Sequence, residues 1–168
     1  KVSTSGKHLL ALINDVLDYS RVSAGRLPFM FRTIDLIALV GKAVLSHRPA
    51  AEQKEVKLRL VRPDDPDPRL VDLKADPDRL FQVMTNLLGN ALKFTPSGGE
   101  IIVSTSILEK VINGREKAFA RVSVKDTGSG IAPGDRNKVF ERFAQAGQME
   151  HHSEGTGLGL PIARGIIR

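Results

Sequence analysis

The chain of 168 residues and 18.3 kDa is long enough for one well-packed domain with a short appended element, but not for two full domains. No apolar run approaches the length of a membrane span, and the absence of cysteine excludes disulfides, thiolate metal sites and cysteine nucleophiles and permits a reducing compartment. We expect a soluble, cytoplasmic fragment, with a membrane anchor left open for the full-length protein. The formal charge of +6 suits an anionic ligand such as a nucleotide. The Lys and Arg residues are scattered and aromatic residues are scarce, which argues against binding of nucleic acid. We also expect no membrane contact by this fragment.

The first predicted element is a helix from Lys7 to about Ala24 with a wide apolar face. The apolar residues that recur at helical spacing are Leu9, Leu10, Leu12, Ile13, Val16, Leu17 and Tyr19. Such a face needs a partner, which we expect upstream of Lys1 or on another chain. No initiator Met is present, so we expect a piece of a longer protein, divided into a helical segment 1–27 and a domain 28–168.

A helix and two strands are predicted next. Asp35 can cap a helix whose inner face carries Leu36, Leu39, Val40, Ala43 and Val44. The alternation of Val56, Leu58 and Leu60 with charged residues predicts a half-buried strand, and residues 70–74 are predicted to form a second one.

The helix predicted from Pro77 to about Phe94 has an unusual polar face. Asp76 caps its start, and we place its core on Leu80, Met84, Leu87 and Ala91. Clear of that core, Gln82, Asn86, Asn90 and Lys93 lie three or four residues apart. Asn is a poor helix former because its side chain competes for backbone hydrogen bonds, so two interior Asn residues indicate a function. Taken alone, a solvated face is the commoner explanation.

Strands over Ile101–Ile107 and Phe119–Lys125 are predicted to form a hairpin that turns at Asn113-Gly114. Alternation places Asp126 on the apolar face of the second strand. A carboxylate there needs hydrogen-bond donors from inside the fold or from a ligand, because burial without them is costly. The glycines that follow, Gly128 and Gly130, allow a sharp turn and the close approach of a flat ligand, although a simple Asp-Thr-Gly turn explains them equally well.

The last predicted elements are a short helix near Asp135–Phe143 and a glycine loop over residues 155–159 that opens a final apolar helix. Free backbone N–H groups and the helix dipole at such a point can face phosphate oxygens. Alone the loop is weak evidence. No strand directly precedes it, as a dinucleotide-binding fold requires, and it lacks the Gly-Lys-Ser/Thr ending of a P-loop.

Together these segments resemble the ATP-binding domains of sensor histidine kinases. Four stretches carry the resemblance: Asn86-Leu-Leu-Gly-Asn90-Ala-Leu-Lys93-Phe-Thr, Asp126-Thr-Gly-Ser-Gly130-Ile, Phe140-Glu-Arg-Phe143 and Gly155-Thr-Gly-Leu-Gly159-Leu. The similarity extends from about Thr33 to the C-terminus, and residues 12–25 resemble the end of the dimerisation hairpin that precedes such domains. The implied fold class is α+β: the two-layer α/β sandwich of the Bergerat fold, with a mixed sheet packed against helices.

The resemblance also assigns residues to ATP and Mg²⁺. It implies that Asn90 coordinates Mg²⁺ through its side-chain oxygen, that Lys93 neutralises phosphate charge and that Asp126 accepts the adenine amino group. It further implies that residues 131–154 form a mobile lid, and that Asn86, Asn90 and Lys93 are catalytic. The full set implied for the nucleotide is Asn86, Asn90, Ala91, Lys93, Asp126, Gly128, Gly130, Ile131, Gly155, Thr156, Gly157, Leu158 and Gly159.

Asn86 bears on the fate of the phosphate. In hydrolysing relatives a Glu four residues before the metal-binding Asn activates water, whereas Asn86 cannot act as a general base. The resemblance therefore implies transfer of the γ-phosphoryl group to a histidine on a dimerisation hairpin, in a homodimer that signals to the receiver domain of a response regulator. Two alternatives are a Bergerat-fold nucleotide-binding domain without kinase output and an interaction module with decayed motifs, and the intact motifs disfavour decay.

The sequence departs from the family pattern in two ways. None of its histidines, His8, His47, His151 and His152, lies in the expected acceptor motif, and we assign none of them catalysis. The sequence stops at Arg168, where the family normally adds two more strands, so we expect the last strands to be missing.

Overall fold

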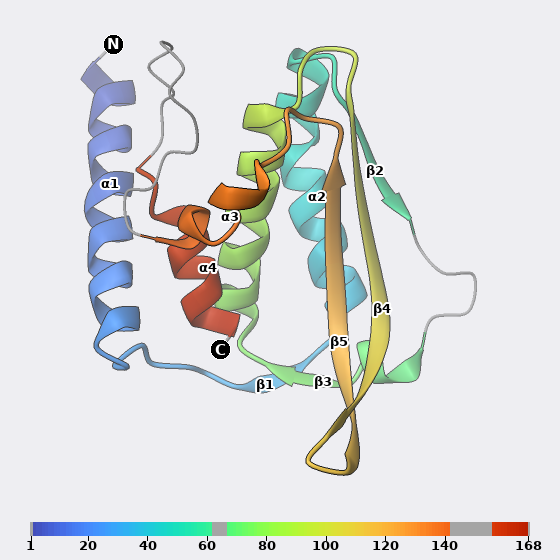
Figure 1. Cartoon of the computed structure of the whole chain (residues 1–168). Helices are drawn as coiled ribbons and strands as arrows, with labels where there is room; N and C mark the ends of the chain where they lie inside the picture. Colours follow the sequence, from blue (N-terminus) through green and yellow to red (C-terminus); the bar gives the residue numbers. More distant parts are fainter. Residues whose placement is uncertain (1, 62–66, 142–155, 168) are drawn as a thin grey trace. The chain divides into compact units, whose positions relative to one another are not determined.

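The computed structural model describes residues 2–61, 67–141 and 156–167, which fall into two compact units (Figure 1). Met30–Gly130 form one unit, and Lys1–Phe29 with Ile131–Arg168 form the other. The first unit contains β1 (Arg32–Ile34), α2 (Leu36–Gln53), β2 (Lys57–Val61), the 3-10 turn η1 (Pro68–Leu70), β3 (Leu73–Ala75), α3 (Pro77–Phe94), β4 (Glu100–Ile112) and β5 (Arg115–Asp126). The second contains α1 (Val2–Ser23), the 3-10 turns η2 (Pro133–Asp135) and η3 (Lys138–Phe140), and α4 (Gly159–Ile167).

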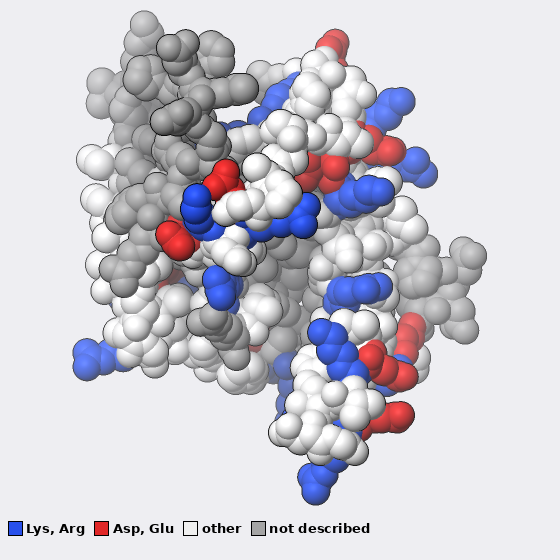
Figure 2. Space-filling view, viewed as in Figure 1, with Lys and Arg blue, Asp and Glu red and all other residues white. Residues whose placement is uncertain are grey.

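The larger unit is built on a mixed sheet with strand order β2-β4-β5. β2 runs parallel to the start of β4, and β4 runs antiparallel to β5 along its whole length. The hairpin between them turns at Asn113 and Gly114, whose φ angles of 52° and 73° suit the twist of the flanking strands. The predicted hairpin is confirmed, with longer strands than expected. Lys, Arg, Asp and Glu side chains are mixed along its exposed surface (Figure 2).

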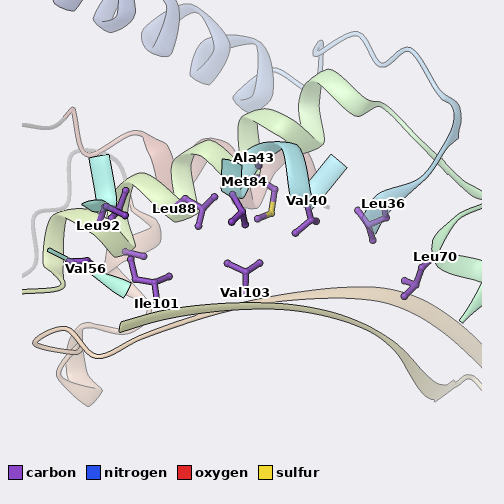
Figure 3. Packing of buried hydrophobic residues seen from close by; sticks show 13 residues of the cluster. Leu36, Val40, Ala43, Val56, Leu70, Met84, Leu88, Leu92, Ile101 and Val103 are labelled. Carbon is purple, nitrogen blue, oxygen red and sulfur yellow. The ribbon is translucent and has the colours of Figure 1, made fainter. Parts of the chain in front are cut away.

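Helices α2 and α3 cover one face of this sheet and form the core with it (Figure 3). Ile101 and Val103 are fully buried on β4 and point toward Val40, Met84 and Leu88 of the two helices. Asp35 caps α2 by accepting a 2.9 Å hydrogen bond from the backbone N–H of Ala38, and the predicted inner face of this helix is confirmed. The expected two-layer α/β fold, with a mixed sheet packed against helices, is therefore present.

The bounds of α3 agree with the prediction, but its buried face is wider than expected. The buried residues are Val83, Met84, Leu88, Ala91 and Leu92, whereas Leu80 and Leu87 are half-buried. The sequence offers a leucine at both 87 and 88, so periodicity alone cannot choose between them. The helix packs against both α2 and the sheet, and Leu88 is fully buried in the core that these elements form.

Two short elements differ from the sequence-based expectation. Instead of a strand over residues 70–74, the chain forms η1 and then β3, which pairs with β1. The cause is local, because Asp67 caps the 3-10 turn through the backbone N–H of Arg69 and Leu70 turns into the core. The helix expected near Asp135–Phe143 is two 3-10 turns over its described part, and Phe143 lies outside the described residues.

In the second unit, α1 and α4 pack closely. The side chain of Val22 fills the space that a Cβ on Gly165 would need. Farther along α1, the side chains of Leu9, Leu10, Ile13, Val16 and Leu17 are 48–60% exposed, as expected of an apolar face without its partner. Among the described residues, no helix combines the length and apolar character needed to cross a membrane.

Candidate functional site

The polar face of α3 is present as predicted, in the same unit as Asp126. Asn86, Asn90 and Lys93 are all half-buried, so each side chain keeps some access to solvent. Nζ of Lys93 lies 5.1 Å from the centroid of the Phe94 ring, which is half exposed. Among the described residues, the side-chain amide of Asn90 makes no hydrogen bond, which leaves its oxygen available to a cation or ligand.

Asp126 ends β5 on the face of the sheet that carries the core. Its register partner on β4 is the buried Ile101, which confirms the predicted face. The carboxylate is nevertheless exposed, because the chain turns away at the end of the strand. Oδ1 accepts a 2.8 Å hydrogen bond from the backbone N–H of Gly128. This bond fixes the carboxylate and leaves lone pairs for an external donor.

Residues 126–130 form a loop at the end of β5, called the Asp126 loop, and Gly128 joins this loop to the end of α3. A Cβ at this position would lie 2.7 Å from Oδ1 of Asp126 and 2.7 Å from the carbonyl oxygen of Phe94. No side chain fits there, since the atoms in the way include backbone atoms that cannot turn aside. The close approach places the carboxylate next to the helix end that carries Lys93. The farther Gly130 adopts φ +72°, a conformation that favours glycine.

The last carbonyl groups of α3 are held by side chains that sequence analysis missed. Thr95 donates to the carbonyl oxygen of Ala91 through both its backbone N–H and its hydroxyl. Nζ of Lys54, which follows α2, lies 2.6 Å from the carbonyl oxygen of Leu92 and 2.9 Å from that of Lys93. A helix end leaves its final carbonyls without intrahelical donors, so these contacts stabilise the turn that carries Lys93.

A second unpredicted contact fixes the start of the Asp126 loop. Oγ1 of Thr127 accepts a 2.9 Å hydrogen bond from the backbone N–H of Glu100, and the Thr127 N–H donates back to the Glu100 carbonyl at 3.1 Å. Gly99 lies so close to Thr95 and Thr127 that a Cβ would overlap both. The signal in the sequence is the Gly98-Gly99 pair, which is also typical of a simple turn.

The start of α3 is anchored by Asp76, which is 7% exposed. Its carboxylate accepts hydrogen bonds from the backbone N–H groups of Asp78 and Arg79 at the helix start and of Met30 from the preceding segment. Burial alone would raise the pKa of Asp76, but these donors and the nearby Arg79 charge outweigh it and hold the pKa below its ordinary value.

The glycine loop lies in the other unit. Its described part, Thr156 to Gly159, leads into α4, as predicted. Oγ1 of Thr156 accepts a hydrogen bond from the backbone N–H of Leu158, and Gly157 adopts φ +66°. Leu158 is fully buried and anchors the loop. Gly155 lies outside the described residues.

The predicted site residues are thus divided between the two units. Asn86, Asn90, Ala91, Lys93, Asp126, Gly128 and Gly130 belong to the larger unit, and Ile131 with Thr156–Gly159 to the smaller one. That both groups hold one nucleotide stays a prediction. The predicted lid over 131–154 is described only as far as residue 141, and His151 and His152 lie outside the described part.

Within the described ranges no three His, Cys, Asp or Glu residues cluster as a metal site. The Asn90 amide offers one oxygen donor on α3. This donor set suits Mg²⁺, which takes few protein ligands and keeps waters or substrate phosphates in its other positions.

Comparisons with known proteins show which family the chain resembles. The family model of histidine kinase-, DNA gyrase B-, and HSP90-like ATPases matches residues 75–168. The chain is 38% identical over 161 residues to drug sensory protein A of Synechocystis sp., covering 95% of this chain and 24% of that protein. It is 34% identical over 175 residues to the cell-division control histidine kinase PdhS of Brucella abortus, covering 99% of this chain and 16% of that protein.

A similar solved structure is that of full-length ShkA in complex with AMPPNP, with a TM-score of 0.76 and 33% identity. The similarity covers 97% of this chain and 31% of the ShkA chain. The chain therefore spans a quarter or less of the two curated relatives and about a third of ShkA.

Proposed function

The chain belongs to the family of histidine kinase-, DNA gyrase B- and HSP90-like ATPases, and on that premise we propose that it is the ATP-binding part of a sensor histidine kinase. The name of PdhS supports a histidine kinase, and the AMPPNP bound to ShkA supports nucleotide binding. The observation that carries the proposal is the contact of Gly128 with the Phe94 carbonyl, which places the Asp126 carboxylate beside the α3 end that bears Lys93.

Each residue of this site has a separate task in binding. The free lone pairs of Asp126 accept a hydrogen bond from the amino group of adenine, and the absence of a side chain at Gly128 lets this carboxylate lie beside the end of α3. Lys93 offsets the phosphate charge. Asn90 holds Mg²⁺ through its amide oxygen, and the bound ion would neutralise phosphate charge during transfer. A phosphate-binding role for the loop from Thr156 to Gly159, which belongs to the other unit, is a separate part of the proposal.

The reaction is phosphoryl transfer to a histidine outside residues 1–168, on a dimerisation hairpin. The bond between the γ-phosphorus and the bridging oxygen breaks, a bond to an imidazole nitrogen forms, ADP leaves, and the displaced imidazole proton goes to solvent. Asn86 supports transfer over hydrolysis, because its amide cannot take a proton from water. The exposed apolar face of α1 supports a homodimer of the whole protein, and a receiver domain is the expected next acceptor.

Two measurements test this proposal. Mg²⁺ and ATP should stabilise the chain by about 2.7 kcal/mol at a free ATP concentration of 100 times Kd, seen as a higher Tm. With radiolabelled ATP, a separately added dimerisation hairpin with its histidine should become labelled, while the chain alone should not.

No stabilisation by millimolar Mg-ATP would contradict nucleotide binding. Stabilisation without labelling of the hairpin would favour a nucleotide-binding domain without kinase output. Rapid release of inorganic phosphate without an acceptor would contradict the role given to Asn86.

A further inference from the structure

Lys54 is a charged residue that no motif of the sequence singles out, yet it contacts the helix that carries the proposed site. We propose that Lys54 is a positioning residue for nucleotide binding, which holds the C-terminal turn of α3 so that Lys93 and Asp126 lie where the nucleotide needs them. The inference rests on the function proposed above. It adds the residue that follows α2, a helix that contributes no group to the predicted site.

The geometry of the contact is that of a helix cap supplied by another helix. Lys54 is the residue after α2, and its half-buried ammonium group donates to the carbonyl oxygens of Leu92 and Lys93, at 2.6 and 2.9 Å. The carbonyl end of a helix carries partial negative charge, so a cation there is favourable. The positive charge of Lys54 also makes the electrostatic potential at this helix end less negative. This matters because, in the proposed function, the helix end must lie near phosphates.

The turn after α2 is held to the loop after α3 by a second side chain. The carboxylate of Glu55 accepts a 2.6 Å hydrogen bond from the Ser97 hydroxyl, and the Glu55 carbonyl accepts one from the backbone N–H of Gly98. Glu55 itself adopts φ +59°, in the left-handed region that residues with a side chain avoid. A residue persists in this conformation only where its surroundings fix it, so the junction between the two helices is tightly constrained.

The turn that Lys54 holds leads directly to the site. Lys93 provides one of its carbonyls and also the side chain assigned to the phosphates. The next residue, Phe94, has the carbonyl against which Gly128 packs, and Gly128 in turn donates to Asp126. A displacement of this turn therefore moves a phosphate-binding and an adenine-binding group together. A cap that acted on stability alone would not change affinity in the folded protein.

The test compares Lys54→Met, which keeps the length of the side chain but removes the donors, with Lys54→Arg, which keeps charge and donors. Lys57→Met is the matched control, because Lys57 is exposed on β2 and its side chain contacts no carbonyl of α3. Dissociation constants for ATP and for adenosine are measured by calorimetry or competition on the whole chain, at a temperature where thermal unfolding shows every variant folded.

We expect Lys54→Met to weaken the binding of both ATP and adenosine about tenfold, since charge-assisted hydrogen bonds are lost. The dissociation constants of Lys54→Arg should stay within about threefold of the wild-type values, and those of Lys57→Met should equal the wild-type values. In the nucleotide-free protein, the amide resonance of Gly128 should shift in Lys54→Met and not in Lys57→Met.

Four outcomes would overturn the inference. A lower Tm for Lys54→Met with unchanged dissociation constants would show a role in stability only. Weaker binding of ATP with unchanged adenosine binding would show an effect of charge and not of position. A wild-type chain that binds no nucleotide would overturn the proposed function and this inference with it, whereas equal binding by wild type and Lys54→Met would overturn this inference alone.

Discussion

The backbone N–H of Gly128 donates a 2.8 Å hydrogen bond to Oδ1 of Asp126, and a Cβ on Gly128 would lie 2.7 Å from that same oxygen. It would also lie 2.7 Å from the carbonyl oxygen of Phe94, which belongs to the backbone and cannot rotate away. Gly128→Ala should therefore force a shift of the loop and destabilise the chain by about 1–3 kcal/mol. Urea unfolding measures this loss, and ATP binding should weaken with it.

A matched glycine on α3 should respond in the opposite direction. Gly89 is exposed, and a Cβ there would meet no atom within 4 Å. Gly89→Ala should stabilise the chain by about 0.5–1 kcal/mol, because alanine loses less conformational entropy in a helix. Equal destabilisation by both substitutions would show that crowding at Gly128 is not the cause.

Asp126→Asn should change which base the site prefers. The asparagine oxygen can keep the hydrogen bond from Gly128, but an amide donor then replaces the second carboxylate oxygen. That donor faces the adenine amino group, so the affinity for ATP should fall by about tenfold or more. ITP carries a carbonyl in place of this amino group, so its affinity should fall less or rise. Dissociation constants for both nucleotides test this, and an unchanged ATP affinity would remove Asp126 from base recognition.

Asn90→Ala should remove the part of ATP affinity that depends on Mg²⁺. The wild type should bind ATP more tightly in Mg²⁺ than in EDTA, and the variant should show little difference, because the amide oxygen that holds the ion is gone. Gln82→Ala is the control, since Gln82 carries an amide on the same helix face but accepts a 3.0 Å hydrogen bond from Arg79. If Gln82→Ala has the same effect as Asn90→Ala, the proposed role of Asn90 is wrong.

The parts of the fold that could be predicted are those with a local cause. Asp76 and Pro77 mark the start of α3, and Pro96 explains its end, so the bounds of the helix were predictable from neighbouring residues. The Asn113-Gly114 turn is equally local, because both positions need a positive φ. In the same way, alternation along β5 was enough to place Asp126 on the core face of the sheet.

Apart from the 3-10 turn η1, the parts that could not be predicted depend on contacts between distant segments. Lys54 near the end of one helix would ordinarily be expected to cap its own helix, and nothing in the sequence indicates that it caps α3 instead. The pairing of β1 with β3 involves only three residues on each strand, too few for alternation to be recognised. The choice between Leu87 and Leu88 as the core position likewise depends on where α2 and the sheet lie.

The carboxylate of Asp76 should make the stability of the chain depend on pH. Its folded pKa lies below its ordinary value of 3.8, so its contribution is fully present above that value and is lost as the pH falls through the folded pKa. In Asp76→Asn the amide oxygen can still cap α3, but the second carboxylate oxygen, which accepts from Met30, is replaced by a donor. The variant should therefore be less stable than the wild type at pH 7. The difference in unfolding free energy between the two should shrink at pH 3 and below. A difference that is the same at pH 7 and pH 3 would show that the charge is not involved.

Lys110 and Lys117 are direct register partners on β4 and β5, and both are exposed. Like charges that face each other across an antiparallel pair are destabilising, so Lys110→Glu should stabilise the chain by about 0.5 kcal/mol. Lys117→Glu should do the same, and the gain should fade in 1 M salt, where exposed charges are screened. The double substitution restores a like-charged pair and should be less stable than the sum of the two single effects. Urea unfolding of all four proteins measures this coupling, and strictly additive effects would show that the two lysines do not interact.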